Sequence, residues 1–122
     1  MPELVLLGKD WQARALVRAQ LIEDGVEVEA HESIADLGTV PARPHPKARF
    51  PRLLVADVGA SDNPVADLDR LGGWAKLVPV WVIVGHNTVP AGQLEGRGFD
   101  RIIFRPVDVN ELVELIKSRI RR

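Results

Sequence analysis

The chain has 122 residues, of which 46% are apolar and 27% charged, and its 16 basic and 17 acidic residues leave a formal net charge of -1. This composition predicts one globular domain over residues 1–122, large enough to bury a core without disulfides or metals. The absence of cysteine excludes disulfide frameworks and cysteine-based zinc sites. The near-zero charge argues against direct nucleic-acid binding and against attachment to an anionic membrane. No apolar stretch is long enough to span a bilayer and no secretory signal opens the chain, so we expect a cytoplasmic protein.

The first elements alternate between strand and helix patterns. The apolar run 4–7 ends at Gly8 and is typical of a strand buried on both faces. Asp10 is expected to cap a helix over 11–23, because apolar residues recur there at helical spacing. Apolar and acidic residues then alternate over 26–30, which predicts a half-exposed strand near a sheet edge.

The middle of the chain predicts a loop, a strand and a helix. Ser33 is expected to cap a brief helix, and three prolines within the next dozen residues predict an irregular loop. The apolar run 52–56 predicts a buried strand that places Asp57 at its C-terminal end. A helix is expected over 64–71, capped by Asp62 or Asn63 and broken by the glycine pair that follows.

The last third predicts two strands and two helices. The run 79–84 is almost entirely apolar and β-branched or aromatic, which indicates a central strand. A fourth helix is expected over 88–97, although one proline and two glycines weaken it. A strand over 101–104 follows, and Asp108 is expected to cap the last helix. The apolar face of that helix comprises Val109, Leu112, Leu115, Ile116 and Ile120.

This alternation of strands and helices predicts one parallel sheet covered on both faces. In such folds the functional crevice lies outside the carboxyl ends of the strands. The residues expected at that edge are Gly8, Lys9, Asp10, Asp57, the segment 84–87, Arg105 and Pro106.

The order and spacing of these features resemble the receiver domain of bacterial two-component response regulators. The resemblance covers essentially the whole chain. Its sharpest elements are the segment 51–57 ending in Asp57, Gly25 after the first helix, and the segment 98–100 leading to Arg105 and Pro106. It implies a flavodoxin-like, three-layer α/β/α fold with a five-stranded parallel sheet in the order 2-1-3-4-5.

In that family an acidic pair after the first strand binds Mg²⁺, and the aspartate ending the third strand accepts a phosphoryl group. A Thr or Ser ends the fourth strand, and a Lys precedes Pro after the fifth. Asp57 matches the phosphoacceptor, and Asp10 lies one residue beyond the acidic pair. The family's other positions hold different residue types, namely Gly8 and Lys9 for the acidic pair, Val84 for the Thr or Ser, Ile102 for the switch aromatic and Arg105 for the Lys.

These departures predict a pseudo-receiver. A glycine and a lysine provide no carboxylate for a hard divalent ion, and valine cannot hydrogen-bond a phosphoryl oxygen. With Lys9 and Arg105 on either side, Asp57 is expected to be ion-paired, ionised and poorly phosphorylated. We therefore expect a protein–protein interaction module for signalling without catalysis, a cofactor or a membrane partner. The family's partner surface, formed by the fourth helix, fifth strand and fifth helix, also allows a homodimer.

Alternatives to a pseudo-receiver remain open. One is a conventional receiver that is phosphorylated at Asp57 with Mg²⁺, and another is a small-molecule binder or an enzyme that uses the crevice. A hydrolase triad of Ser61, His86 and Asp57 lacks the Gly-x-Ser-x-Gly turn that exposes such a nucleophile. The histidines show no metal-ligand spacing. The basic residues Arg43, Lys47, Arg49 and Arg52 lack interleaved aromatics and are weak evidence for nucleic acid.

Overall fold

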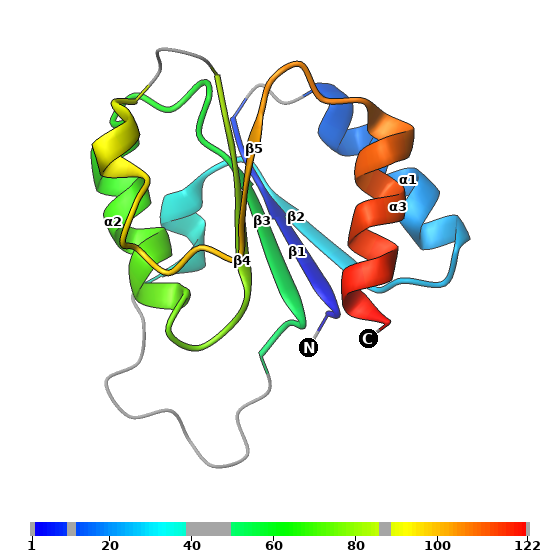
Figure 1. Cartoon of the computed structure of the whole chain (residues 1–122). Helices are drawn as coiled ribbons and strands as arrows, with labels where there is room; N and C mark the ends of the chain where they lie inside the picture. The colour runs from blue at the N-terminus through cyan, green and yellow to red at the C-terminus, as the bar shows by residue number, and fades with distance from the viewer. Residues whose placement is uncertain (1, 10–11, 39–49, 86–88, 122) are drawn as a thin grey trace.

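The computed structural model describes residues 2–9, 12–38, 50–85 and 89–121 (Figure 1). Five strands form one parallel sheet in the order β2-β1-β3-β4-β5, which confirms the predicted flavodoxin-like topology. The strands are β1 (Leu4–Leu7), β2 (Val28–His31), β3 (Leu53–Asp57), β4 (Val80–Val84) and β5 (Arg101–Phe104). The three central strands are buried at every position, whereas β2 and β5 at the edges are partly exposed.

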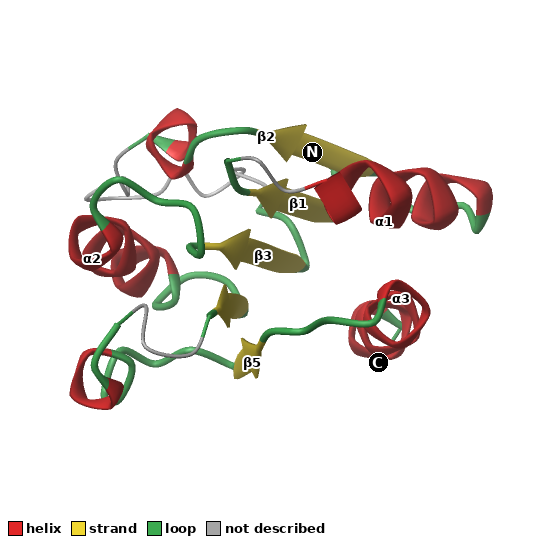
Figure 2. Ribbon diagram, turned by 90° about the horizontal axis from the view of Figure 1, so that it is seen from above, coloured by secondary structure: helices red, strands yellow, loops and turns green. Residues whose placement is uncertain are grey.

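Helices cover both faces of the sheet (Figure 2). One face carries α1 (Gln12–Glu23) and α3 (Val109–Ile120). The other carries α2 (Pro64–Trp74) and two short 3-10 helices, η1 (Ile34–Leu37) and η2 (Ala91–Gln93). Within the described ranges, none of the helices is both long and apolar enough to cross a membrane.

Each face of the sheet has its own hydrophobic core, because side chains alternate between the faces along every strand. Toward α2 the strands contribute Leu54 and Val82, and toward α1 and α3 they contribute Val55 and Trp81. Trp74 and Trp81 are both buried, and the indole Nε1 of Trp81 donates to Asp100 Oδ2 at 2.7 Å. Trp11 lies outside the described residues.

The helix caps follow the sequence signals. Asp108 accepts a hydrogen bond from the amide of Glu111 at 2.9 Å, and Asn63 accepts one from the amide of Ala66 at 3.2 Å. Ser33 caps η1 as predicted. The predicted Asp10 cap of α1 falls outside the described residues.

Two predicted boundaries are wrong by more than one residue. The second strand begins at Val28 rather than residue 26, because the Val26 amide donates to the Leu21 carbonyl and is thereby held in the turn after α1. Helix α2 continues through the glycine pair to Trp74 instead of ending at residue 71. The buried Trp74 ring packs edge-to-face on Phe50, and this packing outweighs the low helix propensity of two glycines, about 1 kcal/mol each.

The prediction of a fourth α-helix over 88–97 is also wrong. Between residues 89 and 100 the structure contains only the three-residue η2. Gly96 and Gly98 both have positive φ angles, 76° and 81°, which turn the chain away from a helical path. Arg97 instead reaches back, and its Nη2 donates to Gln93 Oε1 at 2.9 Å.

The core predicts the effect of a truncation. Leu54 is fully buried in β3, so Leu54→Ala removes apolar contacts and leaves a cavity that the neighbouring strands cannot fill. We expect the free energy of unfolding to fall by about 3 kcal/mol in urea denaturation. Leu77→Ala, at a leucine that is 36% exposed, is the control and should cost less than about 1 kcal/mol. Equal losses in the two variants would contradict this assignment of the core.

Candidate functional site

The candidate site lies at the carboxyl edge of the sheet and is centred on Asp57. This residue ends β3, and among the described residues it is the one buried polar or charged residue, with 2% of its surface exposed. Its neighbours β1 and β4 are parallel to β3, so the residues that follow each strand converge on the same edge. A buried carboxylate requires compensating partners, and the surrounding loops supply them.

Each carboxylate oxygen of Asp57 has a partner. The amide of Gly59 donates to Oδ1 at 2.7 Å, and the Nη2 of Arg105 donates to Oδ2 in an ion pair. Arg105 follows β5, and its own amide donates to the Val84 carbonyl at 3.0 Å, which fixes where its side chain starts. The peptide bond between Arg105 and Pro106 is cis. The side chain of Arg105 is 43% exposed, so the guanidinium covers the carboxylate from the solvent side.

Gly59 makes room for this ion pair, although it was not among the site residues expected from the sequence. A Cβ atom at this position would lie 3.0 Å from Arg105 Nε and 3.0 Å from Asp57 Oδ1. Both distances are shorter than ordinary van der Waals contact. A glycine two residues after the strand-end aspartate is the signal that could have indicated the close approach of another side chain.

Burial raises the pKa of Asp57 above its ordinary value of 3.8. The hydrogen bond from Gly59 and the charge of Arg105 both lower it, but they do not outweigh the loss of hydration. The sequence predicts that the neighbouring cations lower the pKa of Asp57, but the effect of burial, which raises it, is larger. Arg105 compensates for the burial only in part.

Lys9 lines the same cavity as Asp57 but forms its ion pair with a different carboxylate, contrary to the expectation from the sequence. Its Nζ lies 3.5 Å from Asp62 Oδ2, and both side chains are mostly exposed. Gly8, before it, has a φ of 155°, a conformation that side-chain-bearing residues rarely adopt. Lys9 is thus directed toward the loop before α2, where Asp62 is a hydrated partner, whereas Asp57 pairs with Arg105. Asp10 lies outside the described residues.

The two remaining receiver positions hold aliphatic side chains. Val84 is 1% exposed at the end of β4 and belongs to the core on the α2 side of the sheet, so it presents no hydroxyl at the edge. Ile102, in β5, is partly buried against the same core. Neither residue can hydrogen-bond a group bound near Asp57.

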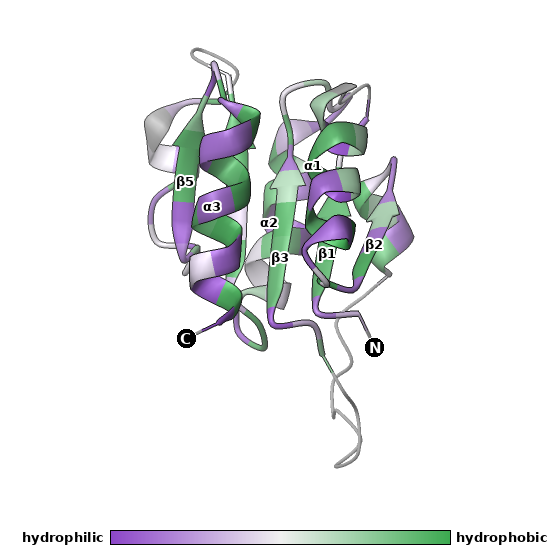
Figure 3. Ribbon diagram, turned by 90° about the vertical axis from the view of Figure 1, so that its right-hand side faces the viewer, coloured by the Kyte–Doolittle hydropathy of each residue, from purple (hydrophilic) through white to green (hydrophobic). Residues whose placement is uncertain are grey.

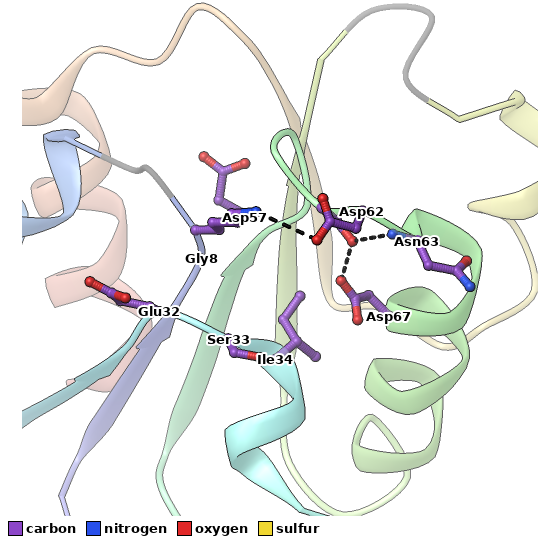
Figure 4. Close-up of a pocket in the computed structure, with 10 residues that line it drawn as sticks. Gly8, Glu32, Ser33, Ile34, Asp57, Asp62, Asn63 and Asp67 are labelled. Atoms are coloured by element: carbon purple, nitrogen blue, oxygen red, sulfur yellow. Dashed lines mark hydrogen bonds and ion pairs between the residues drawn. The ribbon is translucent and has the colours of Figure 1, made fainter.

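Beside Asp57 a cavity of about 220 Å³ opens between β1, β3 and the beginning of α2 (Figure 4). Ser61 donates to Asp67 and accepts from the amide of Asn63 at 3.2 Å, so its hydroxyl is held against α2. This arrangement does not support the triad alternative, in which Ser61 would meet a histidine, and His86 lies outside the described residues. The cavity lining is Gly8, Lys9, Glu32, Ser33, Ile34, Asp57, Ser61, Asp62, Asn63 and Asp67.

The described residues do not fit the Mg²⁺ site of a receiver. Gly8 and Lys9 provide no carboxylate, and Asp57 is engaged by Arg105. No group of three or more His, Cys, Asp or Glu in the described segments is arranged to hold a metal ion. A hard divalent ion prefers several oxygen ligands, and these residues supply only part of such a set.

Arg14, in the first turn of α1, is a second site residue that was not expected from the sequence. Its Nη1 donates to the carbonyl of Gly8 at 2.6 Å and also to the carbonyl of His31. These carbonyls end β1 and β2, so a single guanidinium joins two strands to α1 at the edge where the cavity lies. Arg52, from the predicted basic segment, instead donates to the Ile120 carbonyl at 3.1 Å at the opposite edge.

The chain is similar over its whole length to solved receiver-type structures. FixJ-N is 26% identical with a TM-score of 0.67, and the alignment covers 100% of this chain and 96% of that chain. A CheY-like response regulator receiver domain protein from Methanospirillum hungatei JF-1 is 17% identical with a TM-score of 0.73, covering 99% and 94%. The receiver domain of NtrX from Brucella abortus is 21% identical with a TM-score of 0.67, covering 97% and 98%.

No protein-family model and no curated protein sequence matches the chain. The structural neighbours are nevertheless response regulator receiver domains, and the chain has their CheY-type fold. The similarity that these comparisons show is therefore one of backbone arrangement.

Removing the guanidinium should raise the pKa of Asp57 further. The pKa is already higher in the folded than in the unfolded chain, so ionisation of Asp57 lowers the free energy of unfolding as the pH rises from 3.8 through the folded pKa. In Arg105→Ala, ionisation of Asp57 lowers the free energy of unfolding by more, because the compensating charge is gone. We expect the variant to be less stable than the unaltered chain by about 1–2 kcal/mol at pH 7, and by less under acidic conditions where Asp57 is protonated.

Carboxyl-carbon NMR titration and urea denaturation at several pH values measure the two effects of Arg105→Ala. Arg97→Ala is the matched control, because it removes the same charge from an ion pair with the exposed Asp69. It should leave the pKa of Asp57 unchanged. A pKa of Asp57 that does not rise in Arg105→Ala would show that the ion pair contributes nothing to the site.

Gly59→Ala should separate Arg105 from Asp57 without unfolding the chain. The new methyl group would press on the guanidinium, which is half-exposed and can move into solvent. We expect the pKa of Asp57 to rise in the same direction as in Arg105→Ala, with a small stability loss of about 1 kcal/mol. Gly92→Ala is the control, because a Cβ atom there would meet no other atom within 4 Å. An unchanged Asp57 pKa in Gly59→Ala would contradict the steric role.

Proposed function

We propose that the chain is a receiver-type signalling module that acts by binding a protein partner and has lost efficient phosphorylation of Asp57. The ion pair between Asp57 and Arg105 is the observation that carries this proposal. The CheY-type fold and the receiver domains among its structural neighbours support the broader assignment to signalling. We place its action in the cytoplasm and assign it no catalysis and no cofactor of its own.

Phosphorylation of an aspartate requires a carboxylate oxygen that can attack phosphorus and cations that neutralise the charge developing on the phosphoryl group. Here Oδ2 of Asp57 is covered by Arg105, and Oδ1 accepts from Gly59. The guanidinium would have to leave before a phosphoryl donor could approach Oδ2. The guanidinium of Arg105 thus occupies the place where the phosphoryl group would bind.

The positions around the carboxylate support the same proposal. Val84 cannot donate to a phosphoryl oxygen, and Lys9 pairs with Asp62. A phosphoryl group on Asp57 would therefore gain few hydrogen bonds from these residues. Without such bonds, phosphorylation would have little means of changing the conformation of β4 and β5.

The partner surface expected from the resemblance is altered in this chain. The described residues before β5 form only η2 where a fourth helix was expected. A groove of about 320 Å³ runs between β5 and the beginning of α3, and Phe104 on its wall is 48% exposed. We place the partner-binding surface on β5 and α3 rather than on a fourth helix.

A conventional receiver is the second candidate function, favoured by the position of Asp57 at the end of β3. In that case a donor phosphorylates Asp57 with Mg²⁺, and Arg105 moves aside. A small-molecule binder is the remaining alternative, for which the cavity beside Asp57 offers the space. Thermal-shift screening with small ligands addresses that alternative directly.

Incubation with acetyl phosphate and Mg²⁺, followed by intact-mass measurement, tests the proposal. We expect no stoichiometric phosphorylation of the unaltered chain and no tight binding of beryllofluoride. The triple variant Lys9→Asp, Val84→Thr, Arg105→Lys restores the carboxylate, hydroxyl and amine of the family pattern and should become labelled, because the lysine is a compact charge on a flexible stem.

The same substitutions combined with Asp57→Ala serve as the control and should abolish any labelling of the triple variant. Stoichiometric labelling of the unaltered chain at Asp57 would favour the conventional receiver over the pseudo-receiver. A triple variant that stays unlabelled, while remaining folded by circular dichroism, would show that Arg105, Lys9 and Val84 are not what blocks the reaction.

A further inference from the structure

Helix α1 is apolar on two opposite sides, and only one of them faces the sheet. Val17 and Leu21 are fully buried against the core that α1 shares with α3. On the outward side, Leu16 is 62% exposed and Ile22 is 46% exposed. A surface helix of a globular protein ordinarily carries one apolar stripe and a polar opposite face. The second apolar side of α1 therefore calls for an explanation beyond the folding of this chain.

Helix α3 provides a comparison within the same molecule. The two helices lie side by side on one face of the sheet (Figure 3). The outward residues of α3 are polar or charged, including Asn110, Glu114 and Ser118. Exposure of apolar residues is thus a property of α1 and not of every helix on this face.

The outward residues of α1 have the spacing of a helix–helix seam. Ala15, Ala19 and Ile22 recur at intervals of four and three residues, so they line one side of the helix, and Leu16 flanks them. All four are exposed. The two alanines permit close approach of a second helix, while Leu16 and Ile22 supply the apolar surface to be buried.

Two oppositely charged residues flank this seam at the spacing that is typical of ion pairs between two parallel helices. Arg18 lies on one flank and Glu23 on the other, five residues later. In parallel two-stranded helix pairs, residues five apart on opposite flanks meet across the seam as interhelical ion pairs. Both side chains are exposed, and within the described part of the chain neither forms an ion pair.

We propose that two copies of this chain associate through α1, with the two helices parallel about a two-fold axis. This axis brings the seam residues Ala15, Ala19 and Ile22 against their counterparts and forms two Arg18–Glu23 pairs between the copies. An antiparallel pair would instead place each flank beside the same flank of the other copy. The complementary charges lie on a single surface, and this self-complementarity identifies the partner as a second copy.

The size of the surface sets the strength of the association. Helix α1 has 12 residues, fewer than two full heptads, so the buried area is small. An interface of this size supports a weak dimer, with a dissociation constant on the order of 100 µM. This surface includes none of the residues that surround Asp57, so the association does not depend on the proposed function.

Sedimentation equilibrium over a concentration series up to about 1 mM tests the association. We expect a monomer–dimer equilibrium, which Ile22→Glu weakens by at least about tenfold because it places a charge in the seam. Arg18→Glu should weaken it by about tenfold through like-charge contacts with Glu23, and the double variant Arg18→Glu, Glu23→Arg should restore it. All these positions are exposed, so the fold should persist, which circular dichroism checks.

Val65→Glu is the matched control, because it adds the same charge at another exposed apolar residue, on α2. It should leave the dissociation constant unchanged. The proposal is overturned if the chain is monomeric throughout the series. It is equally overturned if Val65→Glu dissociates the dimer while Ile22→Glu does not, or if the charge swap fails to restore association.

Discussion

The ion pair between Asp57 and Arg105 is the contact on which the carboxyl edge of the sheet depends. A carboxylate that is almost entirely withdrawn from water at the end of β3 is costly unless cations and amide donors compensate it. Here the compensation comes from two loops, the Gly59 amide after β3 and the guanidinium after β5. The pKa of Asp57 remains raised by burial, because the ion pair does not fully replace the hydration that the carboxylate loses. The pair is therefore not a source of large stability. Arg105 therefore supplies part of the charge compensation from within the chain.

The two edge strands of the sheet, β2 and β5, are covered by different elements, and this difference affects how the molecule can bind partners. At the β2 edge, α1 packs closely and Arg14 joins the strand ends to it. At the β5 edge, the short η2 covers less of the sheet than an α-helix would, and Arg97 holds that segment to α2 through its ion pair with Asp69. The β5 edge exposes a groove beside α3, whereas the β2 side exposes the outer surface of a helix.

Most of the fold could be predicted because the buried strands and capped helices carry local signals. The central strands are short apolar runs, and Asp108 marks the beginning of α3, so the alternation was recoverable from these signals, whereas the strand order came from the resemblance to receiver domains. Helix α2 extends past its glycines because of tertiary packing at Trp74, which no local pattern contains. At the site, the approach of Arg105 to Asp57 followed from position in the fold. The direction of Lys9 did not, because it depends on competition between Asp57 and the hydrated Asp62.

Arg14 ties the outer surface of α1 to the edge where Asp57 lies. Its guanidinium joins the carbonyls of Gly8 and His31, so the first turn of α1 cannot shift without breaking bonds at the ends of β1 and β2. Gly8 also lines the cavity beside Asp57. A partner that displaces α1 along its axis would thus alter the shape of that cavity, and a group bound in the cavity would resist the displacement. Any coupling between the two sites would be reciprocal, because it is a single free energy, and the element that the two sites share is one helix held by one side chain.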